Sequence, residues 1–348
     1  MNDNKTANPQ ASTSDKATYP QDSKSRINLS IINTNEQAFQ CMDNIIRNVE
    51  KIIVGKTYAV SLVIATLACK GHVLIEDVPG VGKTSLVAAL ARSVNGSFKR
   101  IQFTPDIMPS DITGYSAFSP KTGEFEYRSG AVMSQFVLAD EINRTSPKTQ
   151  SSLLEVMEEN QVTVDGITHP VPSPFMVLAT QNPVDYLGTF ALPEAQLDRF
   201  FMKISLGYPD EDAESKMLDR FKGRSPMDSL SPVAEGGDII RLQELTEAIY
   251  VSPEINKFIV TVTRYTRENL DVMLGASPRA SICLFRAAQA WALYSGRDYV
   301  IPDDVIEMVP HVLSHRILMK QEAKLKKLTV QHVLDNAVAK ATGGANRR

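Results

Sequence analysis

The sequence predicts an α/β domain with a mostly parallel sheet covered by helices, followed by a smaller all-helical domain. Three observations support this prediction. Five short apolar runs in the first part of the chain have the length of strands, helical patterns alternate with them, and the strand patterns fade after residue 207. Because the runs are continuously apolar, both faces of the sheet are expected to be covered.

The candidate elements follow one another along the chain. Residues 1–30 are polar, contain prolines and lack the apolar core of a signal peptide, so a disordered tail is expected. Residues 31–207 form the predicted α/β domain and residues 208–348 the helical domain, with a hinge near 207–212. The candidate strands are HVLI, RIQF, FVLA, FMVLA and FMKISL, and the clearest later helices are LQELTEAIY, PEINKFIVTVTRYTREN, PRASICLFRAAQAWALYSG and PDDVIEMVPHVLSHRI.

Composition limits the classes of function. The chain has 348 residues, a net charge of −3 and 43% hydrophobic residues, which is ordinary for a globular protein and gives no support for non-specific nucleic-acid binding. Cys41, Cys69 and Cys283 lack metal-ligand spacing, so we expect buried thiols in a reducing, cytoplasmic compartment. The apolar stretch AVSLVIATLAC has about half of the ~20 residues that a membrane helix needs, so it predicts a buried helix and no membrane insertion.

The segment EDVPGVGKTS, residues 76–85, resembles a phosphate-binding loop of the pattern G-x-x-x-x-G-K-[ST]. Small residues let backbone N–H groups surround phosphate oxygens, the lysine neutralises them, and the hydroxyl reaches Mg²⁺. Asp77 replaces the first glycine, which we expect to be tolerated because Asp visits turn and left-handed conformations. An apolar strand pattern before the segment and a helical pattern after it favour a P-loop NTPase. The predicted nucleotide-binding residues of the loop are Pro79, Gly80, Val81, Gly82, Lys83, Thr84 and Ser85.

Two later strands end in polar residues that suit this chemistry. In VLADEINR, Asp140 is predicted to hold Mg²⁺ together with Thr84, and Glu141 to polarise the attacking water. In ATQNP, Asn182 is placed to reach a γ-phosphate or the water if its strand lies between the other two.

Two segments predict hairpins, and two others contain arginines of interest. SPKTGEFEYRSG has alternation centred on a glycine, and QVTVDGITHPVPSPF carries Asp165-Gly166 between alternating residues.

LPEAQLDRF and GASPRA contain Arg199 and Arg279. An isolated arginine is usually a surface residue or part of a structural ion pair. These two are therefore candidates for a functional role only because the other motifs are also present.

The order and wording of these motifs resemble the AAA+ ATPases, and closely their MoxR family. The resemblance begins near residue 35 and includes IVGK at residues 53–56. It implies that Val54 and Gly55 lie by the adenine, that Asp140 and Glu141 are the Walker B pair, and that the second domain is the helical lid. It further implies these roles: Asn182 as sensor 1, Arg199 as the arginine finger and Arg279 as the sensor 2 residue, with Arg144 left open as another arginine that acts in trans.

This resemblance implies a homo-hexameric ring that hydrolyses ATP with Mg²⁺ and remodels or matures other proteins, including insertion of a cofactor or metal. Its hairpins would contact a substrate near the ring centre, and a partner with a von Willebrand factor A domain is implied. Three alternatives stay open. The first is a magnesium-chelatase-type motor, for which no metal cluster is readable in the sequence. The second is an ATP-dependent switch or scaffold, which would not need Glu141. The third is a DNA motor, for which the positive charges of Lys121 and Arg128 in the first hairpin are balanced by Glu124 and Glu126.

Overall fold

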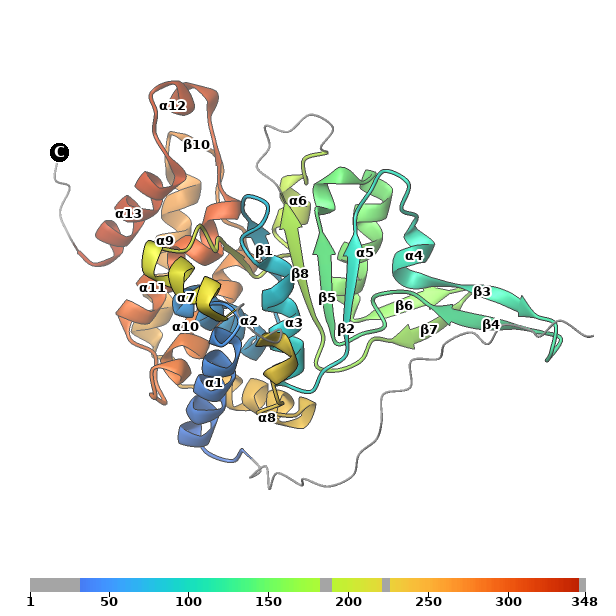
Figure 1. The fold of residues 1–348 in the computed structure, drawn as a ribbon. Helices are drawn as coiled ribbons and strands as arrows, with labels where there is room; N and C mark the ends of the chain where they lie inside the picture. Colours follow the sequence, from blue (N-terminus) through green and yellow to red (C-terminus); the bar gives the residue numbers. More distant parts are fainter. Residues whose placement is uncertain (1–31, 182–189, 221–225, 344–348) are drawn as a thin grey trace, which may run out of the picture. The chain divides into compact units, whose positions relative to one another are not determined.

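A parallel sheet forms the centre of the α/β region (Figure 1). The computed structural model describes residues 32–181, 190–220 and 226–343. Within these residues the sheet has the strand order β2-β5-β8-β1-β9, and all neighbouring strands run parallel. The five apolar runs form its strands, so the predicted sheet is confirmed. These strands are β1 Val73–Glu76, β2 Phe98–Gln102, β5 Phe136–Asp140, β8 Met176–Gln181 and β9 Met202–Ile204.

Helices cover both faces of this sheet, as the continuous apolarity of the strands predicted. Successive residues of β1 belong to different cores: Val73 and Ile75 lie in the core shared with α1–α3, and Leu74 in the core shared with α5. Burial of successive side chains on both faces explains why this strand is continuously apolar. The helices of this region are α1 Asn35–Glu50, α2 Thr57–Ala68, α3 Lys83–Ser93, α4 Pro109–Thr113, α5 Pro147–Glu159, α6 Glu194–Leu197 and the 3₁₀ helix η1 Ile142–Arg144.

The apolar stretch near residue 60 is a buried helix, as predicted. Every residue of α2 from Ala59 to Ala68 is buried. No helix among the described residues is long and apolar enough to cross a membrane. The cysteines Cys41, Cys69 and Cys283 are buried free thiols.

Both predicted hairpins are present and lie next to each other. The first pairs β3 Gly114–Ser119 with β4 Glu124–Ser129, and the second pairs β6 Gln161–Val164 with β7 Ile167–Pro170. Asp165 and Gly166 both have positive φ, at 51° and 79°, which a tight two-residue turn requires. Tyr127 stacks on His169 with ring centroids 4.0 Å apart, so the two hairpins contact each other at the edge of the α/β region (Figure 1).

The region after β9 is mainly helical, as predicted. Its helices are α7 Glu211–Arg220, η2 Pro226–Ser229, α8 Gly236–Glu247, α9 Pro253–Glu268, α10 Pro278–Tyr294, α11 Pro302–Leu313, η3 Ser314–Arg316, α12 Gln321–Leu325 and α13 Val330–Ala341. Ser252 and Ser277 cap α9 and α10, and a proline follows each cap. One short antiparallel ladder, β10 Val272–Leu274 with β11 Leu318–Met319, was not predicted.

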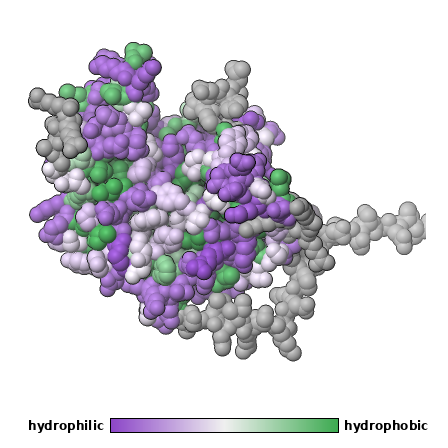
Figure 2. Space-filling model, turned by 60° about the vertical axis from the view of Figure 1, so that its left-hand side comes forward, coloured by the Kyte–Doolittle hydropathy of each residue, from purple (hydrophilic) through white to green (hydrophobic). Residues whose placement is uncertain are grey.

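The α/β and helical regions pack against each other. Residues 31–348 form one compact unit, in which α10 contacts both α1 and α2. The division at residue 207 therefore stays a prediction. On the face shown in Figure 2, hydrophilic residues predominate and hydrophobic residues lie in small groups.

Candidate functional site

The segment from Asp77 to Gly82 forms a loop between β1 and α3, as a phosphate loop requires. Gly80 and Gly82 have φ angles of 86° and 91°, a conformation that favours glycine. No atom lies within 4 Å of the position that a Cβ of Gly80 would occupy, so the loop is open there. Gly82 caps α3, whose first N–H groups therefore face the loop. This arrangement suits anion binding.

Asp77 does not take the left-handed conformation that we expected to explain its place in the loop. It is not among the described residues with positive φ. Its side chain is instead buried and accepts hydrogen bonds from residues 205–207. A carboxylate with several donors is stable when buried, so the position is suited to Asp for its side chain and not for its backbone.

Lys83 lines a cavity of about 400 Å³ together with the other predicted phosphate and magnesium residues except Val81. Its ammonium donates to the backbone carbonyl of Asp77 at 2.8 Å. Burial lowers the pKa of Lys83, and the charges of Asp77, Asp140 and Glu141 oppose this change. The cavity is lined by Pro79, Gly80, Gly82, Lys83, Thr84, Ser85, Arg100, Gln102, Asp140 and Glu141. Hydroxyl and carboxylate oxygens are the ligands that Mg²⁺ prefers, so the residues present fit a magnesium nucleotide.

The two acids at the end of β5 are held by residues of the neighbouring strands. Asp140 accepts from the hydroxyl of Thr180 on β8 at 2.6 Å, and forms an ion pair of 2.5 Å with Arg100 on β2. Glu141 has a φ of 58°, and its backbone N–H donates to the same Thr180 hydroxyl at 2.8 Å. The strand order thus fixes where both carboxylates lie.

The carboxylate of Glu141 is engaged by two side chains of its own subunit. Gln102 donates to it at 3.0 Å, and Arg144 forms an ion pair of 3.2 Å with it. Arg144, which the sequence left open as a residue acting in trans, therefore lies beside the phosphate cavity of its own chain.

A second, more apolar cavity of about 330 Å³ adjoins the phosphate loop. It shares Gly80, Gly82 and Ser85 with the phosphate cavity. Its remaining lining residues are Ile52, Ile53, Val54, Lys56, Val81, Tyr208, Pro209, Glu214, Met217, Pro226 and Met227. An apolar cavity beside a phosphate site suits a purine base.

Gly55 does not line this cavity, although the resemblance places it by the adenine with Val54. Its φ is 71°, and a Cβ there would lie 2.8 Å from the Cβ of Ala213. Gly55 thus allows the loop that carries Val54 to approach α7 closely.

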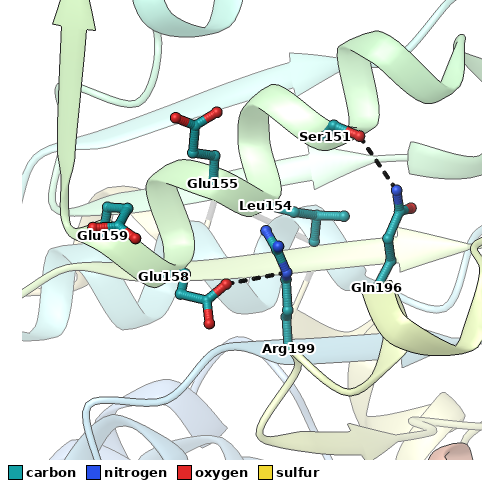
Figure 3. Close-up of a pocket in the computed structure, with 7 residues that line it drawn as sticks. All are labelled: Ser151, Leu154, Glu155, Glu158, Glu159, Gln196 and Arg199. Atoms are coloured by element: carbon teal, nitrogen blue, oxygen red, sulfur yellow. Dashed lines mark hydrogen bonds and ion pairs between the residues drawn. The ribbon is translucent and has the colours of Figure 1, made fainter.

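Arg199 and Arg279 lie apart from both cavities and share one acceptor. Arg199 Nε is 3.2 Å from one oxygen of Glu158, and Arg279 donates to the other oxygen at 2.9 Å. Arg199 lines a cavity of about 250 Å³ between α5 and the segment that carries Gln196 (Figure 3). Among the described residues, none lines both this cavity and either the phosphate or the apolar cavity.

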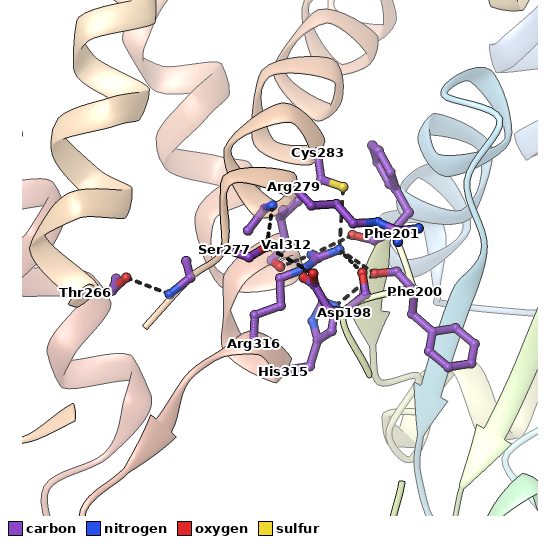
Figure 4. Close-up of polar contacts among 12 residues, drawn as sticks. Asp198, Phe200, Phe201, Thr266, Ser277, Arg279, Cys283, Val312, His315 and Arg316 are labelled. Carbon is purple, nitrogen blue, oxygen red and sulfur yellow. Dashed lines mark hydrogen bonds and ion pairs between the residues drawn. The ribbon is translucent and has the colours of Figure 1, made fainter. Parts of the chain in front are cut away.

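A buried network fixes the backbone beside both arginines (Figure 4). Asp198, next to Arg199, accepts from Arg316 Nε at 2.7 Å and from the hydroxyl of Ser277 at 3.0 Å. Ser277 in turn caps the helix whose second residue is Arg279. Arg316 also donates to the carbonyls of Phe200, Phe201 and Val312. Removal of one partner from such a buried ion pair is strongly destabilising.

Asn182 lies outside the described residues. The preceding residue, Gln181, ends β8 and donates to Glu76 at 2.8 Å. Several residues of the site were not predicted, because their roles follow from strand order or from tertiary contacts: Arg100, Gln102, Glu158, Thr180, Asp198, Ser277 and Arg316.

Comparisons with known proteins found two family domains that match this chain. Residues 72–202 match the ATPase family associated with various cellular activities (AAA), and residues 264–337 match the AAA lid domain. The chain is 50% identical to the protein YeaC of Bacillus subtilis over 289 residues, which cover 83% of this chain and 90% of YeaC. It is 44% identical to the chaperone MoxR1 of Mycobacterium tuberculosis over 306 residues, which cover 85% of this chain and 81% of MoxR1.

A solved structure is also similar. The crystal structure of a candidate ATPase from Cytophaga hutchinsonii has a TM-score of 0.82 and 36% sequence identity to this chain, and the match covers 88% of this chain and 96% of that one. The family match, the lid match and the similarity to MoxR1 together show that the chain belongs to the MoxR family of AAA+ ATPases.

Proposed function

We propose that this protein binds ATP with Mg²⁺, hydrolyses it in a cytoplasmic ring of identical subunits, and uses the energy to remodel or mature partner proteins. The observation that carries this proposal is the phosphate cavity. One cavity brings together the loop glycines, Lys83, Thr84 and the two acids at the end of β5. A phosphate cradle, a magnesium pair and a carboxylate for water are the parts that ATP hydrolysis requires.

Each residue of the cavity has a distinct role in this proposal. Lys83 and the N–H groups at the start of α3 bind phosphate oxygens, and Thr84 with Asp140 holds the metal. Mg²⁺, when bound, neutralises charge on the phosphates. Glu141 orients and deprotonates the attacking water, and Asn182 contacts the γ-phosphate. Gln102 and Arg144 both contact Oε2 of Glu141, so they orient the carboxylate that accepts the proton of water.

We further propose that Arg199 and Arg279 act on the nucleotide of a neighbouring subunit. This is supported by their position, since both contact Glu158 and neither lines the phosphate cavity. A head-to-tail contact that repeats can close into a ring, and a hexamer is the form that the resemblance implies. In that contact the phosphates of the neighbour would replace Glu158 as the acceptor for both guanidinium groups.

The partner proteins are proposed from the hairpins and from the resemblance. Phe118 and Phe125 are exposed on the first hairpin and stack edge to face with ring centroids 5.7 Å apart. Exposed aromatic pairs favour contact with another protein. A partner with a von Willebrand factor A domain, and a role in the insertion of a cofactor or metal, are finer proposals of the same kind.

Turnover measured against protein concentration tests this function. We expect MgATP to bind at every concentration, and turnover per subunit to rise as light scattering shows assembly, because Arg199 comes from a neighbour. Lys83→Ala should weaken binding itself and therefore lower turnover. Binding without turnover in assembled rings would favour the ATP-dependent switch or scaffold. Full turnover by single subunits would place the arginines in the site of their own chain.

A further inference from the structure

The carboxylate of Asp77 joins the phosphate loop to the segment that leaves β9. One oxygen accepts from the backbone N–H groups of Leu206 and Gly207 at 2.6 and 2.8 Å and from the hydroxyl of Ser205 at 3.2 Å. The other oxygen accepts from the N–H of Val78 at 3.1 Å. Only 7% of Asp77 is exposed, so these donors replace water as its partners.

The backbone of the same residue contacts two further parts of the site. Its carbonyl accepts from the ammonium of Lys83 at 2.8 Å, and its N–H donates to the carbonyl of Gln181, the last residue of β8. Lysine at this position of a phosphate loop reaches the β- and γ-phosphates when a nucleotide is bound. The ammonium has three N–H donors, so Lys83 can hold this carbonyl and phosphate oxygens at the same time, and it connects a bound phosphate to the backbone of Asp77.

The segment held by Asp77 leads directly to the apolar cavity. Gly207 has a φ of 61°, so the chain turns sharply there. The carbonyl of the next residue, Tyr208, accepts from Lys56 at 2.6 Å. Tyr208 and Pro209 line the apolar cavity, and α7 begins at Glu211.

We propose that Asp77 is a positioning residue that couples occupancy of the phosphate site to the segment 205–209, and through it to the wall of the apolar cavity and the start of the helical region. This inference rests on the nucleotide site proposed above. When phosphate engages the other donors of Lys83, the ammonium moves toward it, and its hydrogen bond to the carbonyl of Asp77 passes this movement to the loop. The carboxylate of Asp77 stays bonded to the N–H groups of Leu206 and Gly207, so a shift of the loop is passed to that segment.

The variant Asp77→Gly separates this proposal from the role that the loop pattern suggests. Glycine restores the pattern G-x-x-x-x-G-K-[ST], so a loop that needs only backbone freedom would bind nucleotide as well or better. The structure predicts the opposite, because glycine leaves the N–H groups of Leu206 and Gly207 without their acceptor. We expect Asp77→Gly to bind MgADP about tenfold more weakly than the wild type. The MgADP affinity of Asp77→Asn, which keeps one acceptor oxygen, should lie between those of Asp77→Gly and the wild type.

A probe without a base tests the coupling itself. Magnesium tripolyphosphate can occupy the phosphate loop but cannot fill the apolar cavity. Amide hydrogen exchange of residues 205–209 should change when this probe binds to the wild type, although the probe does not touch them. In Asp77→Gly, at a probe concentration that gives equal occupancy, exchange in this segment should no longer respond. If Asp77→Gly does not fold, Ser205→Ala tests the coupling instead. It removes only the weakest of the three donors to this oxygen of Asp77, so it should partly reduce the exchange response of residues 205–209.

Two results would overturn the proposal alone. One is MgADP affinity in Asp77→Gly that equals or exceeds that of the wild type, and the other is an unchanged exchange response at residues 205–209 in all three variants. A wild type that binds neither MgADP nor tripolyphosphate would overturn this proposal together with the proposed function. Binding of MgADP and tripolyphosphate to the wild type therefore distinguishes a failure of the coupling proposal from a failure of the proposed function.

Discussion

Glu141 and Lys83 face the same cavity, but their surroundings assign them different tasks. Lys83 is buried at the start of α3, where its ammonium can meet phosphates, whereas Glu141 lies beyond the end of β5 and is held by Gln102 and Arg144. We expect Glu141→Gln to keep ATP affinity and lose turnover, because glutamine keeps the shape but cannot accept the proton of water. Lys83→Ala should weaken binding itself.

Equilibrium binding of a fluorescent ATP and single-turnover hydrolysis measure these two effects separately. Gln102→Ala is a useful companion variant, because it releases one hold on Glu141 without removing the carboxylate. Near-normal turnover in Glu141→Gln would remove Glu141 from the role of the base.

At this scale the sequence predicted the residues that chemistry demands and missed those that only position them. The glycines, Lys83, Thr84 and the acids Asp140 and Glu141 stand in short local patterns, so the sequence could name them, and in the structure they line one cavity. Thr180 and Gln102 reach the acids only because β8 and β2 are the neighbours of β5. Strand order is a tertiary property, and no local pattern contains it.

Among the elements, the start of β1 depends on the protonation of a buried histidine. His72 Nδ1 accepts from the N–H of Val177 on β8 at 3.0 Å, and Nε2 lies 2.9 Å from the carbonyl of Met157 on α5. The Val177 bond fixes the neutral tautomer with the proton on Nε2. Burial lowers the pKa of His72 to about 4, since a second proton would have to displace the donor from Val177.

This lowered pKa predicts that the protein becomes less stable as the pH falls. The neutral form is favoured in the fold, so its contribution is fully present above the unfolded pKa of 6.5 and is lost as the pH falls toward about 4. We expect the free energy of unfolding to drop by about 2 kcal/mol through His72 between about pH 7 and about pH 5. Urea unfolding of the wild type and of His72→Gln, which can form both hydrogen bonds without titrating, isolates this part. Equal pH dependence in the two proteins would contradict the prediction.

The hairpin β3–β4 is expected to serve a partner and not the chemistry. Its aromatic pair, Phe118 and Phe125, is exposed by 57% and 74%, and no residue of the hairpin lines the phosphate cavity. The double variant Phe118→Ala/Phe125→Ala should therefore leave basal turnover largely intact. It should reduce the capture of partner proteins by rings locked with Glu141→Gln. Leu325→Ala, an exposed apolar residue of α12 in the helical region, is the matched control.

Two measurements check the hairpin prediction. Basal turnover is compared with the wild type, and captured proteins are quantified by mass spectrometry after co-purification. A collapse of basal turnover while the ring still assembles would show that the hairpin belongs to the active site.

The elements themselves were largely predictable, because their signals are local. Continuous apolar runs indicated strands buried on both faces, and Asp165-Gly166 indicated the tight turn that the second hairpin has. The ladder of β10 and β11 was missed because its strands span only Val272–Leu274 and Leu318–Met319 and are separated in the chain by α10, α11 and η3. Strands this short carry no periodicity to read.

For the whole molecule, the position of the arginines is the least local property. The sequence assigned Arg199 and Arg279 to the nucleotide site, but it did not state where they lie within one subunit. In the structure both contact Glu158, and the network of Asp198, Ser277 and Arg316 fixes the backbone beside each of them. If both arginines act on the nucleotide, as we propose, a complete site requires either a large rearrangement within one chain or a second copy.

Mixing two inactive variants tests the second possibility. An arginine finger contributes roughly 10³ to 10⁵ in rate, so Arg199→Ala should bind ATP but be nearly inactive. Glu141→Gln should also be inactive, because glutamine cannot accept the proton of the attacking water. Where an Arg199→Ala subunit holds the nucleotide, its own Glu141 is intact, and a Glu141→Gln neighbour supplies Arg199. A complete site then reappears, so turnover should rise on mixing.

The ring must be shown to contain both variants, by light scattering and by co-purification of two different tags. Mixed rings without recovery have two explanations: the arginine acts within its own subunit, or one inactive site stops the whole ring. A titration of wild-type subunits with Glu141→Gln separates them. A linear loss of turnover with the fraction of variant would exclude inhibition of the whole ring. Arg199 would then have to act in cis, which would require it to leave Glu158 and cross to the phosphate cavity of its own chain.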